Sequence, residues 1–408
     1  MSPAPSSFSA SPKLLGTFFC LYLAQSIPMS FFSSALQVMM RQADYSLAVI
    51  ALFRMVKLPW VLKLIWAPWV DERCTTLRGY KRLIFSSQFV YAFFILVAAL
   101  LNTQTHLPWV LLLVFLALLS SATQDIATDA LATLSFRRQD KSLVNSMQTM
   151  GSFGGTLVGS GLLLMLLHRY GWQTVVPCLC LFVLVAAVPL ALNRRLHTAP
   201  KEKTIRAHPL DLVRFFARRA IWRQIGFLVI YYAAIIGTLS VIRPYLVDLG
   251  YSMSQIGLMS IAGTGTAFLI SFPVGLLIRR IGRERARLLF ACFTLFVLLY
   301  FRWMASFTPS IAWLSIGVVL LWSSYGMSSV VVYTTAMDCV RPGYEGTDFT
   351  IQTAITHASG LLVAFAAGVV GDGYGYRTLF TFEAVLAALS VLYIVVCFRP
   401  KRSIHPVA

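Results

Sequence analysis

Acidic residues are scarce in this chain, and charged residues of either sign are few. Only 15 of its 408 residues are Asp or Glu, and charged residues make up 12% of the sequence, whereas hydrophobic residues make up 58%. A water-soluble protein of this composition would lack the polar side chains needed to cover its surface. The composition therefore excludes an ordinary soluble protein and indicates a chain that lies mostly in lipid.

The sequence also lacks the signatures of an ATPase, a metal site and a catalytic centre. The glycine-rich segment "GSFGGTLVGSG" at 151–161 has neither a preceding strand nor the Gly-Lys-Ser/Thr ending of a phosphate loop. Its small residues instead allow neighbouring helices to approach closely. An enzyme would need catalytic groups that converge at one depth, and none are present. We therefore expect no enzymatic activity, no metal and no cofactor, with a proton gradient as the energy source.

Long apolar runs, such as "VLLLVFLALL" and "CLCLFVLVAAVPLAL", recur along the whole chain. A helix of about 20 such residues crosses the roughly 30 Å of a bilayer's hydrocarbon core. We predict an all-α polytopic membrane protein whose twelve transmembrane helices lie at 14–38, 46–67, 83–102, 108–133, 143–167, 172–193, 221–246, 255–278, 286–306, 310–337, 349–371 and 377–398.

The second half of the sequence repeats the first. "MQTMG" at Met147 matches "IQTAI" at Ile351, and "YGW" at Tyr170 matches "YGY" at Tyr374, with a separation of 204 residues in both cases. Two six-helix halves in a parallel repeat are typical of transporters that rock between two states. We predict an N-terminal six-helix bundle at 1–193, a cytoplasmic linker at 194–220 and a C-terminal six-helix bundle at 221–408. The linker is either an amphipathic helix on the membrane surface or a solvated tether.

The net charge of +19 is distributed unevenly across the predicted membrane. If the N-terminus is cytoplasmic, 26 of the 34 Lys and Arg residues fall in cytoplasmic segments. This is the positive-inside pattern, and it predicts that both termini are cytoplasmic. The basicity is thus an orientation signal, and we expect the lipid bilayer, and no nucleic acid, as a partner.

Four sequence motifs carry a resemblance to a known family. "LVDLGYSMSQIGLM" and "GLLIRRIGRER" resemble loop signatures of the major facilitator superfamily, the second as a loose copy of its Gly-x-x-x-Asp-Arg turn. "PWVLKLIWAPWVDE" and "SATQDIATDALA" resemble the AmpG-related permeases, which include muropeptide permeases, acetyl-CoA carriers and siderophore permeases of the RhtX/FptX type. AmpG proper has two further spans, so the length and "ATDALA" are more similar to the siderophore branch.

The resemblance implies a major facilitator fold and alternating access. It further implies a monomer in a bacterial inner membrane that imports a siderophore or its ferric complex together with protons. A muropeptide permease, or an importer of another medium-sized anionic solute, is the alternative.

Lys63 and Asp125 are charged residues inside the predicted spans. A charged side chain at mid-bilayer costs about 2.5–3.5 kcal/mol on insertion scales, so it requires a partner, a water-filled cavity or a function. At about 1.5 Å per residue, Lys63 lies roughly 24 Å and Asp125 roughly 25 Å below the outer surface. We therefore predict an ion pair between them.

Asp125 and Asp129 lie one turn apart on the same face of the fourth span. In one interpretation, Asp125 takes up a proton when its cationic partner moves away, because loss of that cation favours the neutral acid. In the other, the two aspartates bind the basic turn around Asp71, Arg78 and Arg82 and hold the cytoplasmic mouth shut. The second interpretation is favoured for Asp129.

The repeat helps to distinguish these interpretations. A shift of 204 residues places Ser329 and Tyr333 at the positions of the two aspartates, so the second half has no acid there. A packing requirement common to both halves would not produce acids in only one of them. This asymmetry favours a role of the aspartates in proton coupling.

Further polar residues predict a cationic cavity that binds an anionic small molecule. Arg54 and Lys57 lie near mid-membrane, Arg243 lies toward the outer side, and Lys63 and Gln25 complete the candidate substrate site. Carboxylate or phenolate groups on the solute would suit these cations, although each cation could instead be paired within the protein. Aromatic residues that would line the same cavity, or serve only in packing, are Tyr231, Tyr232, Trp322, Tyr325 and Tyr333.

Overall fold

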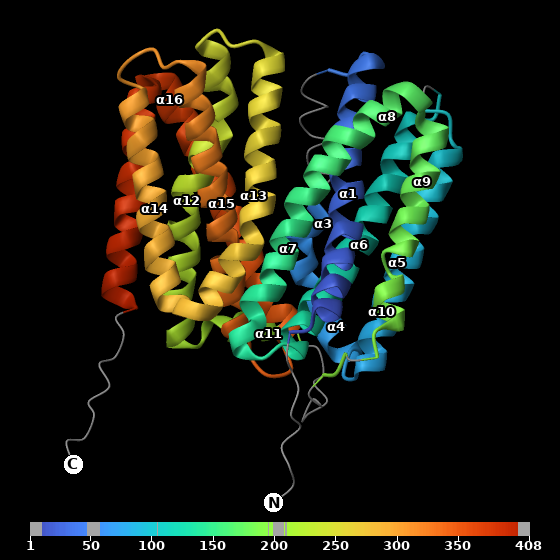
Figure 1. The fold of residues 1–408 in the computed structure, drawn as a ribbon. Coiled ribbons are helices and arrows are strands. Elements are labelled where there is room, and N and C mark those ends of the chain that lie inside the picture. The colour runs from blue at the N-terminus through green and yellow to red at the C-terminus, as the bar shows by residue number, and fades with distance from the viewer. Residues whose placement is uncertain are drawn as a thin grey trace, which may run out of the picture. The chain divides into compact units, whose positions relative to one another are not determined.

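The computed structural model describes residues 10–46, 58–103, 105–194, 196–198, 208 and 210–398. The regular structure of these residues is helical throughout, with no strand (Figure 1). The chain forms two compact units: unit 1 contains residues 1–217 and 336–354, and unit 2 contains residues 218–335 and 355–408. Unit 1 thus includes a short segment from the second half of the sequence, whereas the boundaries at 193 and 221 stay a prediction.

Unit 1 is built from helices that are coloured blue to green in Figure 1. They are α1 (Pro12–Gln42), α3 (Leu58–Leu62), η2 (Lys63–Ile65), α4 (Ala67–Arg73), α5 (Leu77–Leu100), α6 (Leu107–Ser135), η3 (Arg138–Asp140), α7 (Lys141–Thr156), the π-helical η4 (Leu157–Leu162), α8 (Leu163–Tyr170), α9 (Trp172–Val185), α10 (Val188–Leu192) and α11 (Leu210–Phe216).

Unit 2 is built mainly from α12 (Arg219–Asp248), α13 (Met253–Ile281), α14 (Arg283–Met304), α15 (Ile311–Asp338) and α16 (Glu345–Cys397). The ends of α15 and α16 that flank residues 339–344 belong to unit 1. The 53 residues of α16 include a break at Gly375, where φ is 76°.

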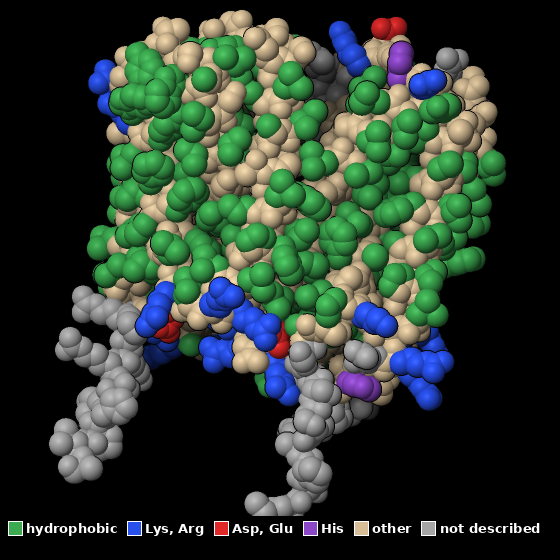
Figure 2. Space-filling model, in the orientation of Figure 1, with side chains coloured by type: hydrophobic (Ala, Val, Ile, Leu, Met, Phe, Trp, Pro, Cys, Tyr) green, Lys and Arg blue, Asp and Glu red, His purple; other side chains and the backbone are tan. Residues whose placement is uncertain are grey.

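Ten of the described helices are long and apolar enough to cross a membrane. They account for eleven of the twelve predicted spans, because α16 contains two spans joined at Gly375. The remaining span, at 46–67, lies largely outside the described residues. Hydrophobic side chains cover the visible sides of each unit in Figure 2, as expected for helices that face lipid.

Apolar side chains of α5 illustrate this lipid-facing surface. Phe89 and Phe93 are 65% and 53% exposed, and Leu100 is 73% exposed. Clusters of exposed large apolar side chains are rare on soluble proteins and mark surfaces that contact another apolar phase. The face of α5 that carries these residues therefore fits a bilayer, while Tyr91 and Ile95 on its other side are fully buried.

The internal repeat is visible in the way that α1 and α12 end. The backbone N–H of Tyr45 donates to Met40 O at 3.0 Å, and that of Tyr251 donates to Leu246 O at 3.2 Å. The residue before each tyrosine has a positive φ, 60° in the first case and 84° in the second. These are the bonds and the left-handed residue of a Schellman helix end. The two halves therefore share a turn geometry as well as sequence.

A second pair of equivalent positions follows the 204-residue repeat. Helix α7 begins at Lys141 and α16 begins at Glu345, exactly one repeat later. Gly171 and Gly375, again one repeat apart, both have a φ of 76°. Only glycine adopts this conformation without strain, so the same bend is built into both halves.

Helices α1 and α7 pack at backbone distance. A Cβ built on Gly155 would lie 2.3 Å from the Cβ of Ser26, and one built on Gly151 would lie 2.6 Å from the Cβ of Tyr22. A Cβ built on Gly159, in η4, would lie 2.3 Å from the backbone oxygen of Ile27. The close helix approach predicted for the glycine-rich segment is thus confirmed, and it brings the polar residues of α1 and α7 together.

Candidate functional site

Lys63 and Asp125 form an ion pair inside unit 1. The ammonium group of Lys63, in η2, donates a hydrogen bond to Oδ2 of Asp125 in α6, and the two side chains are 4% and 7% exposed. Each charge would be costly at this depth without the other. The ion pair predicted from the depths of the two residues is therefore confirmed.

Asp129 lies next to this ion pair, one helical turn along α6. Its Oδ1 accepts hydrogen bonds from the hydroxyl of Tyr22 at 3.0 Å and from Nε2 of Gln148 at 3.1 Å. Its Oδ2 is buried and has no hydrogen-bond partner among the described residues. Because α1 and α7 pack so closely, both of these donors reach the same oxygen.

We call Lys63, Asp125, Asp129, Tyr22 and Gln148 the acid cluster. It contains two carboxyl groups and one ammonium group, so its formal charge is −1 without a bound proton. One proton makes it neutral, and neutrality is the cheaper state in a buried setting. The arrangement can therefore bind one proton at a defined place.

Buried amide groups surround the acid cluster. Gln25 of α1 is 4% exposed, and its Nε2 has no hydrogen-bond partner among the described residues. Both amide atoms of Gln124, next to Asp125 in the sequence, are likewise buried without such a partner. Buried polar groups usually have a partner, so those without one are places where water or a solute binds. Gln25 thus fits the predicted site for a polar solute.

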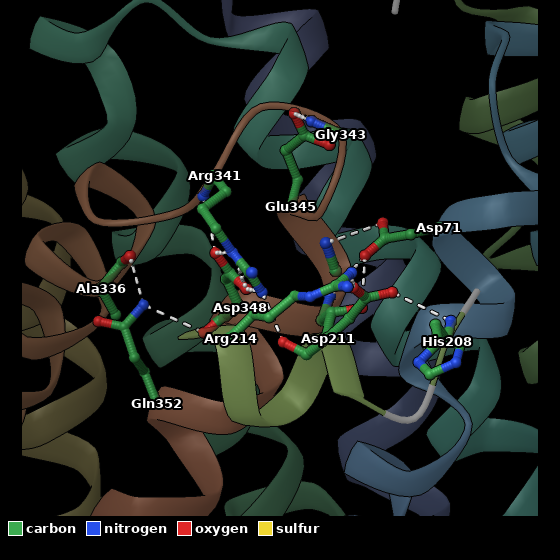
Figure 3. Close-up of polar contacts among 12 residues, drawn as sticks. Asp71, His208, Asp211, Arg214, Ala336, Arg341, Gly343, Glu345, Asp348 and Gln352 are labelled. Atoms are coloured by element: carbon green, nitrogen blue, oxygen red, sulfur yellow. Dashed lines mark hydrogen bonds and ion pairs between the residues drawn. The ribbon is translucent and has the colours of Figure 1, made fainter. Parts of the chain in front are cut away.

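Asp71, at the end of α4, binds the first turn of α16. Its carboxylate accepts hydrogen bonds from the backbone N–H groups of Gly346, at 3.0 Å, and Thr347, at 2.7 Å, and from the Thr347 hydroxyl at 2.7 Å (Figure 3). The first N–H groups of a helix have no partner inside the helix, and the helix dipole attracts a negative charge to them. Asp71 therefore caps α16 across 275 residues of sequence.

The latch expected from the sequence has different partners in the structure. Asp125 bonds to Lys63, and Asp129 to Tyr22 and Gln148, so within the described residues neither aspartate bonds to the basic turn. Arg78 and Arg82 are exposed. An arginine at the membrane surface keeps its hydration, whereas the aspartates face the interior of unit 1, which explains the difference. A latch made by Asp71, Arg78 and Arg82 stays a prediction.

A second set of contacts attaches the linker helix α11 to residues 341–348. Arg341 donates to both carboxylate oxygens of Asp348, with Nη2–Oδ1 at 2.6 Å and Nε–Oδ2 at 2.9 Å, and to the backbone oxygen of Asp211 at 2.9 Å (Figure 3). Its guanidinium lies 4.5 Å from the centre of the Tyr344 ring. Burial lowers the pKa of Arg341, but the hydrogen bonds and charge of Asp348 outweigh it and raise the pKa overall.

Helix α11 is amphipathic and is held against unit 1. Asp211 and Phe215 on one side are 1% and 0% exposed, whereas Leu210 and Val213 are 51% and 64% exposed. The segment is therefore a docked helix with an apolar outer side. The segment Leu210–Phe216 is helical, and its placement on the membrane surface stays a prediction.

The other predicted substrate residues are not brought together by the described structure. Arg54 and Lys57 lie outside the described residues. Arg243, in α12, is exposed and forms no hydrogen bond or ion pair with the described residues. Their role in solute binding stays a prediction.

In unit 2, the repeat equivalents of Asp125 and Asp129 are Ser329 and Tyr333. Ser329, the repeat equivalent of Asp125, is hydrogen-bonded to the hydroxyl of Tyr232 at 3.1 Å. Ser328 donates to the Tyr231 hydroxyl at 3.4 Å, and the rings of Tyr232 and Tyr325 are 5.6 Å apart. The aromatic wall predicted from the sequence is thus a packed and hydrogen-bonded group between α12 and α15.

The sequence analysis did not single out two acidic residues, Asp338 and Glu383, whose surroundings the structure shows. Asp338, at the end of α15, lies 3.8 Å from the ammonium group of Lys141. Glu383, in α16, is fully buried. A lone acid within the apolar "FTFEAVLAAL" was the available signal for Glu383, since ionisable residues inside spans are rare and usually functional.

The fold and the buried acid cluster define a membrane transporter rather than an enzyme. The family model of the Major Facilitator Superfamily matches residues 14–364, so the chain belongs to this family.

Similar proteins include the anhydromuropeptide permease of Escherichia coli (strain K12), which is 24% identical over 392 residues, covering 92% of this chain and 78% of the relative. The putative transporter AmpG 4 of Rickettsia conorii is 22% identical over 403 residues, covering 95% and 96%. The predicted relationship to the AmpG-related permeases is thereby confirmed.

Solved structures show the same fold. The transporter FucP in the outward conformation superposes with a TM-score of 0.72 at 15% identity, covering 96% of this chain and 99% of FucP. The human organic anion transporter MFSD10 (TETRAN) gives a TM-score of 0.71 at 14% identity, covering 94% and 100%. The predicted major facilitator fold is confirmed.

Proposed function

We propose that this chain is a proton-coupled importer of anhydromuropeptide-like solutes in a bacterial inner membrane. The observation that carries the coupling is the acid cluster: a buried Lys63–Asp125 ion pair with Asp129 beside it. Two acids that share one cation are neutral with one proton bound. Uptake and release of that proton would couple a proton gradient to transport.

The proposed cycle uses the charge balance of the acid cluster. While Lys63 bonds to Asp125, the extra proton belongs to the environment of Asp129, which offers one buried oxygen without a partner. Movement of Lys63 away from α6 would leave both acids without a cation and would favour protonation. One proton that moves inward through about 100 mV releases about 2.3 kcal/mol, enough for roughly fifty-fold accumulation.

The contacts of residues 336–354 would act as the cytoplasmic gate. Asp71 caps the start of α16, Arg341 bonds to Asp348 and α11, and Lys141 donates to the backbone oxygen of Met337 at 2.8 Å. The contacts made by Asp71 and Lys141, and the bond from Arg341 to Asp211, join residues far apart in the sequence near the predicted cytoplasmic surface. Opening toward the cytoplasm would require these contacts to break, and each is a hydrogen bond of a charged group that can re-form.

The identity of the curated relatives favours a muropeptide-like cargo. One relative, whose sequence aligns with 92% of this chain, is an anhydromuropeptide permease. Such solutes carry carboxylates, which suit the predicted cations Arg54, Lys57, Lys63 and Arg243 and the amide of Gln25. The siderophore cargo rests on the "ATDALA" motif and the twelve-span length, and it provides the competing outcome of the test.

The test is uptake into proteoliposomes under an imposed pH gradient, inside alkaline. Labelled anhydromuropeptide and labelled ferric siderophore are offered in parallel to wild-type protein, to Asp125→Asn and to Asp372→Asn. Asp372 is an exposed acid of α16 and serves as the matched control. We expect gradient-driven uptake of the muropeptide by wild type and Asp372→Asn only. Uptake of the siderophore alone would show that the transported solute is a siderophore and not a muropeptide. Uptake by Asp125→Asn at the wild-type rate would refute the proton coupling.

A further inference from the structure

Glu383 is a buried acid that has no part in the function proposed above. It lies in α16 beyond the break at Gly375, within unit 2, and its side chain is fully buried. Neither of its carboxyl oxygens has a hydrogen-bond partner among the described residues. Asp125 and Asp129 in unit 1 each accept a hydrogen bond, so Glu383 differs from them in lacking a donor for its carboxyl group.

The carboxyl group of Glu383 fills a space that a glycine leaves open. A Cβ built on Gly237 of α12 would lie 1.9 Å from Oε1 and 2.6 Å from the carboxyl carbon of Glu383. Any other residue at 237 would collide with the acid. The neighbouring apolar cluster contains Ala234 of α12, Leu298 of α14 and Ala384 of α16.

Charged and titratable groups on the packed helices do not compensate Glu383. Arg302 of α14 donates to the hydroxyls of Thr381, at 2.7 Å, and Ser306, at 3.1 Å. Tyr245 of α12 packs against the ring of Phe380 at 5.3 Å. None of the described charged side chains forms an ion pair with Glu383. The carboxyl group of Glu383 is thus buried without a counter-charge among the described residues.

An ionised carboxylate in such a place would cost several kcal/mol, even after the surroundings relax. A buried acid without a counter-charge takes up a proton instead. Separation of α12 from α16 would admit water to the carboxyl group. Water would solvate the carboxylate and so remove the cost of ionising it. In the predicted topology, Glu383 lies about 9 Å below the outer surface, counted from residue 377 at about 1.5 Å per residue.

We infer that Glu383 is a second proton-binding site, which holds its proton while α12 and α16 are packed and releases it when they separate. The occupancy of this site follows from the contacts of Glu383 alone. Its contribution to transport rests on the proposed proton coupling. The two parts therefore need separate measurements.

The first measurement is infrared spectroscopy of the purified full-length protein in lipid vesicles. We expect wild type at neutral pH to show the carbonyl-stretch band of a protonated carboxylic acid that Glu383→Gln lacks and Asp372→Asn retains. Glutamine has the shape of the protonated acid, so this variant keeps the packing, which size-exclusion chromatography checks. Glu383→Asp should restore a band. If wild type and Glu383→Gln have identical bands, Glu383 is ionised and the inference is wrong.

The second measurement compares exchange with accumulation, using labelled anhydromuropeptide as the probe. Glu383→Gln should exchange solute across vesicles at the wild-type rate without a gradient. Its gradient-driven accumulation should fall by about fifty-fold, the loss expected for one proton at about 100 mV. If Glu383→Gln accumulates solute to the wild-type level, Glu383 contributes no proton to transport and serves only in packing. If wild type itself moves no solute, the proposed function fails, and the infrared result still decides whether the proton is bound.

Discussion

The acid cluster of unit 1 and the tyrosine–serine group of unit 2 share two repeat-equivalent positions, since Asp125 corresponds to Ser329 and Asp129 to Tyr333. In unit 1, Asp125 is paired with Lys63. In unit 2, the equivalent Ser329 bonds to Tyr232, and the described part of unit 2 contains no lysine. The same fold thus holds an ionic site in one half and a neutral site in the other. Helix packing alone does not demand acids at these positions, so their presence in unit 1 points to chemistry.

The comparison also holds in the opposite direction. Glu383 of unit 2 corresponds to Leu179 of unit 1, which packs in an apolar core and is 2% exposed. Each unit therefore has a proton-binding candidate at a place where the other has a neutral residue. The sites differ in surroundings as well, because Asp125 is paired with a cation, whereas Glu383 has no hydrogen-bond partner among the described residues.

The largest expected effect comes from removing the acid that only unit 1 has. Asp125→Asn should abolish gradient-driven uptake, because the cluster loses an acid, and the remaining Lys63 and Asp129 are already neutral together without an extra proton. The variant also loses the buried Lys63–Asp125 ion pair, so it should unfold at a lower temperature. Lys63→Met combined with Asp125→Leu should restore thermal stability but not uptake. Restored uptake in this double variant would show that the ion pair is purely structural.

The next largest effect comes from placing an acid in the unit that lacks one. Ser329→Asp should lower the free energy of unfolding by about 3–5 kcal/mol, because no described lysine is available as a partner in unit 2. Ser329→Ala removes only the bond to Tyr232 and should cost about 1 kcal/mol. Thermal unfolding in detergent compares the two variants. Equal stability would mean that unit 2 accepts an acid as readily as unit 1 does.

A smaller effect concerns the close approach of α1 and α7, which the second half does not share. The repeat equivalents of Gly151 and Gly155 are Ile355 and Ser359. Gly155→Ala should lower the free energy of unfolding by about 1–3 kcal/mol, because its Cβ would overlap Ser26. Gly161→Ala, with nothing within 4 Å of the added Cβ, is the matched control and should be neutral. Thermal unfolding that is unchanged in Gly155→Ala would argue against backbone-distance packing.

The smallest effect is expected at the cap of α16. Asp71→Asn removes the charge but retains an acceptor for Gly346 and Thr347, so about 1 kcal/mol of the helix-end interaction should be lost. In a background where the other six cysteines are replaced, Cys339 should then react faster with a thiol reagent, because residues 336–354 would separate more often from the rest of unit 1. Arg169→Ala, at an exposed side chain of α8, should leave the labelling rate unchanged. Slower labelling of Asp71→Asn would contradict a gate at this place.

The Lys63–Asp125 pair was predictable because helix geometry converts residue number into depth. Two opposite charges at one depth in lipid have few other ways to become neutral, so their pairing follows. The partners of Asp71 were not predictable in this way. They are backbone N–H groups of Gly346 and Thr347, which carry no charge pattern and lie 275 residues away.

The eleven spans found among the described residues were also accessible to sequence reasoning, because hydrophobic length is a one-dimensional property. The helix boundaries at Lys141 and Glu345 then follow from the repeat. The environment of Glu383 was not accessible, because it depends on which residue of another helix faces it. Gly237 faces Glu383 because of the way in which α12 and α16 are rotated about their axes. The sequence alone does not give this rotation.

The matching bends at Gly171 and Gly375 have an evolutionary consequence. A duplicated gene would have begun with the same bend and the same side chains in both copies. The bend has stayed, with a φ of 76° in each copy, while the ionisable residues have diverged. A side chain added at either glycine would strain the backbone in the same way, whereas a change at an ionisable residue affects only the half that carries it.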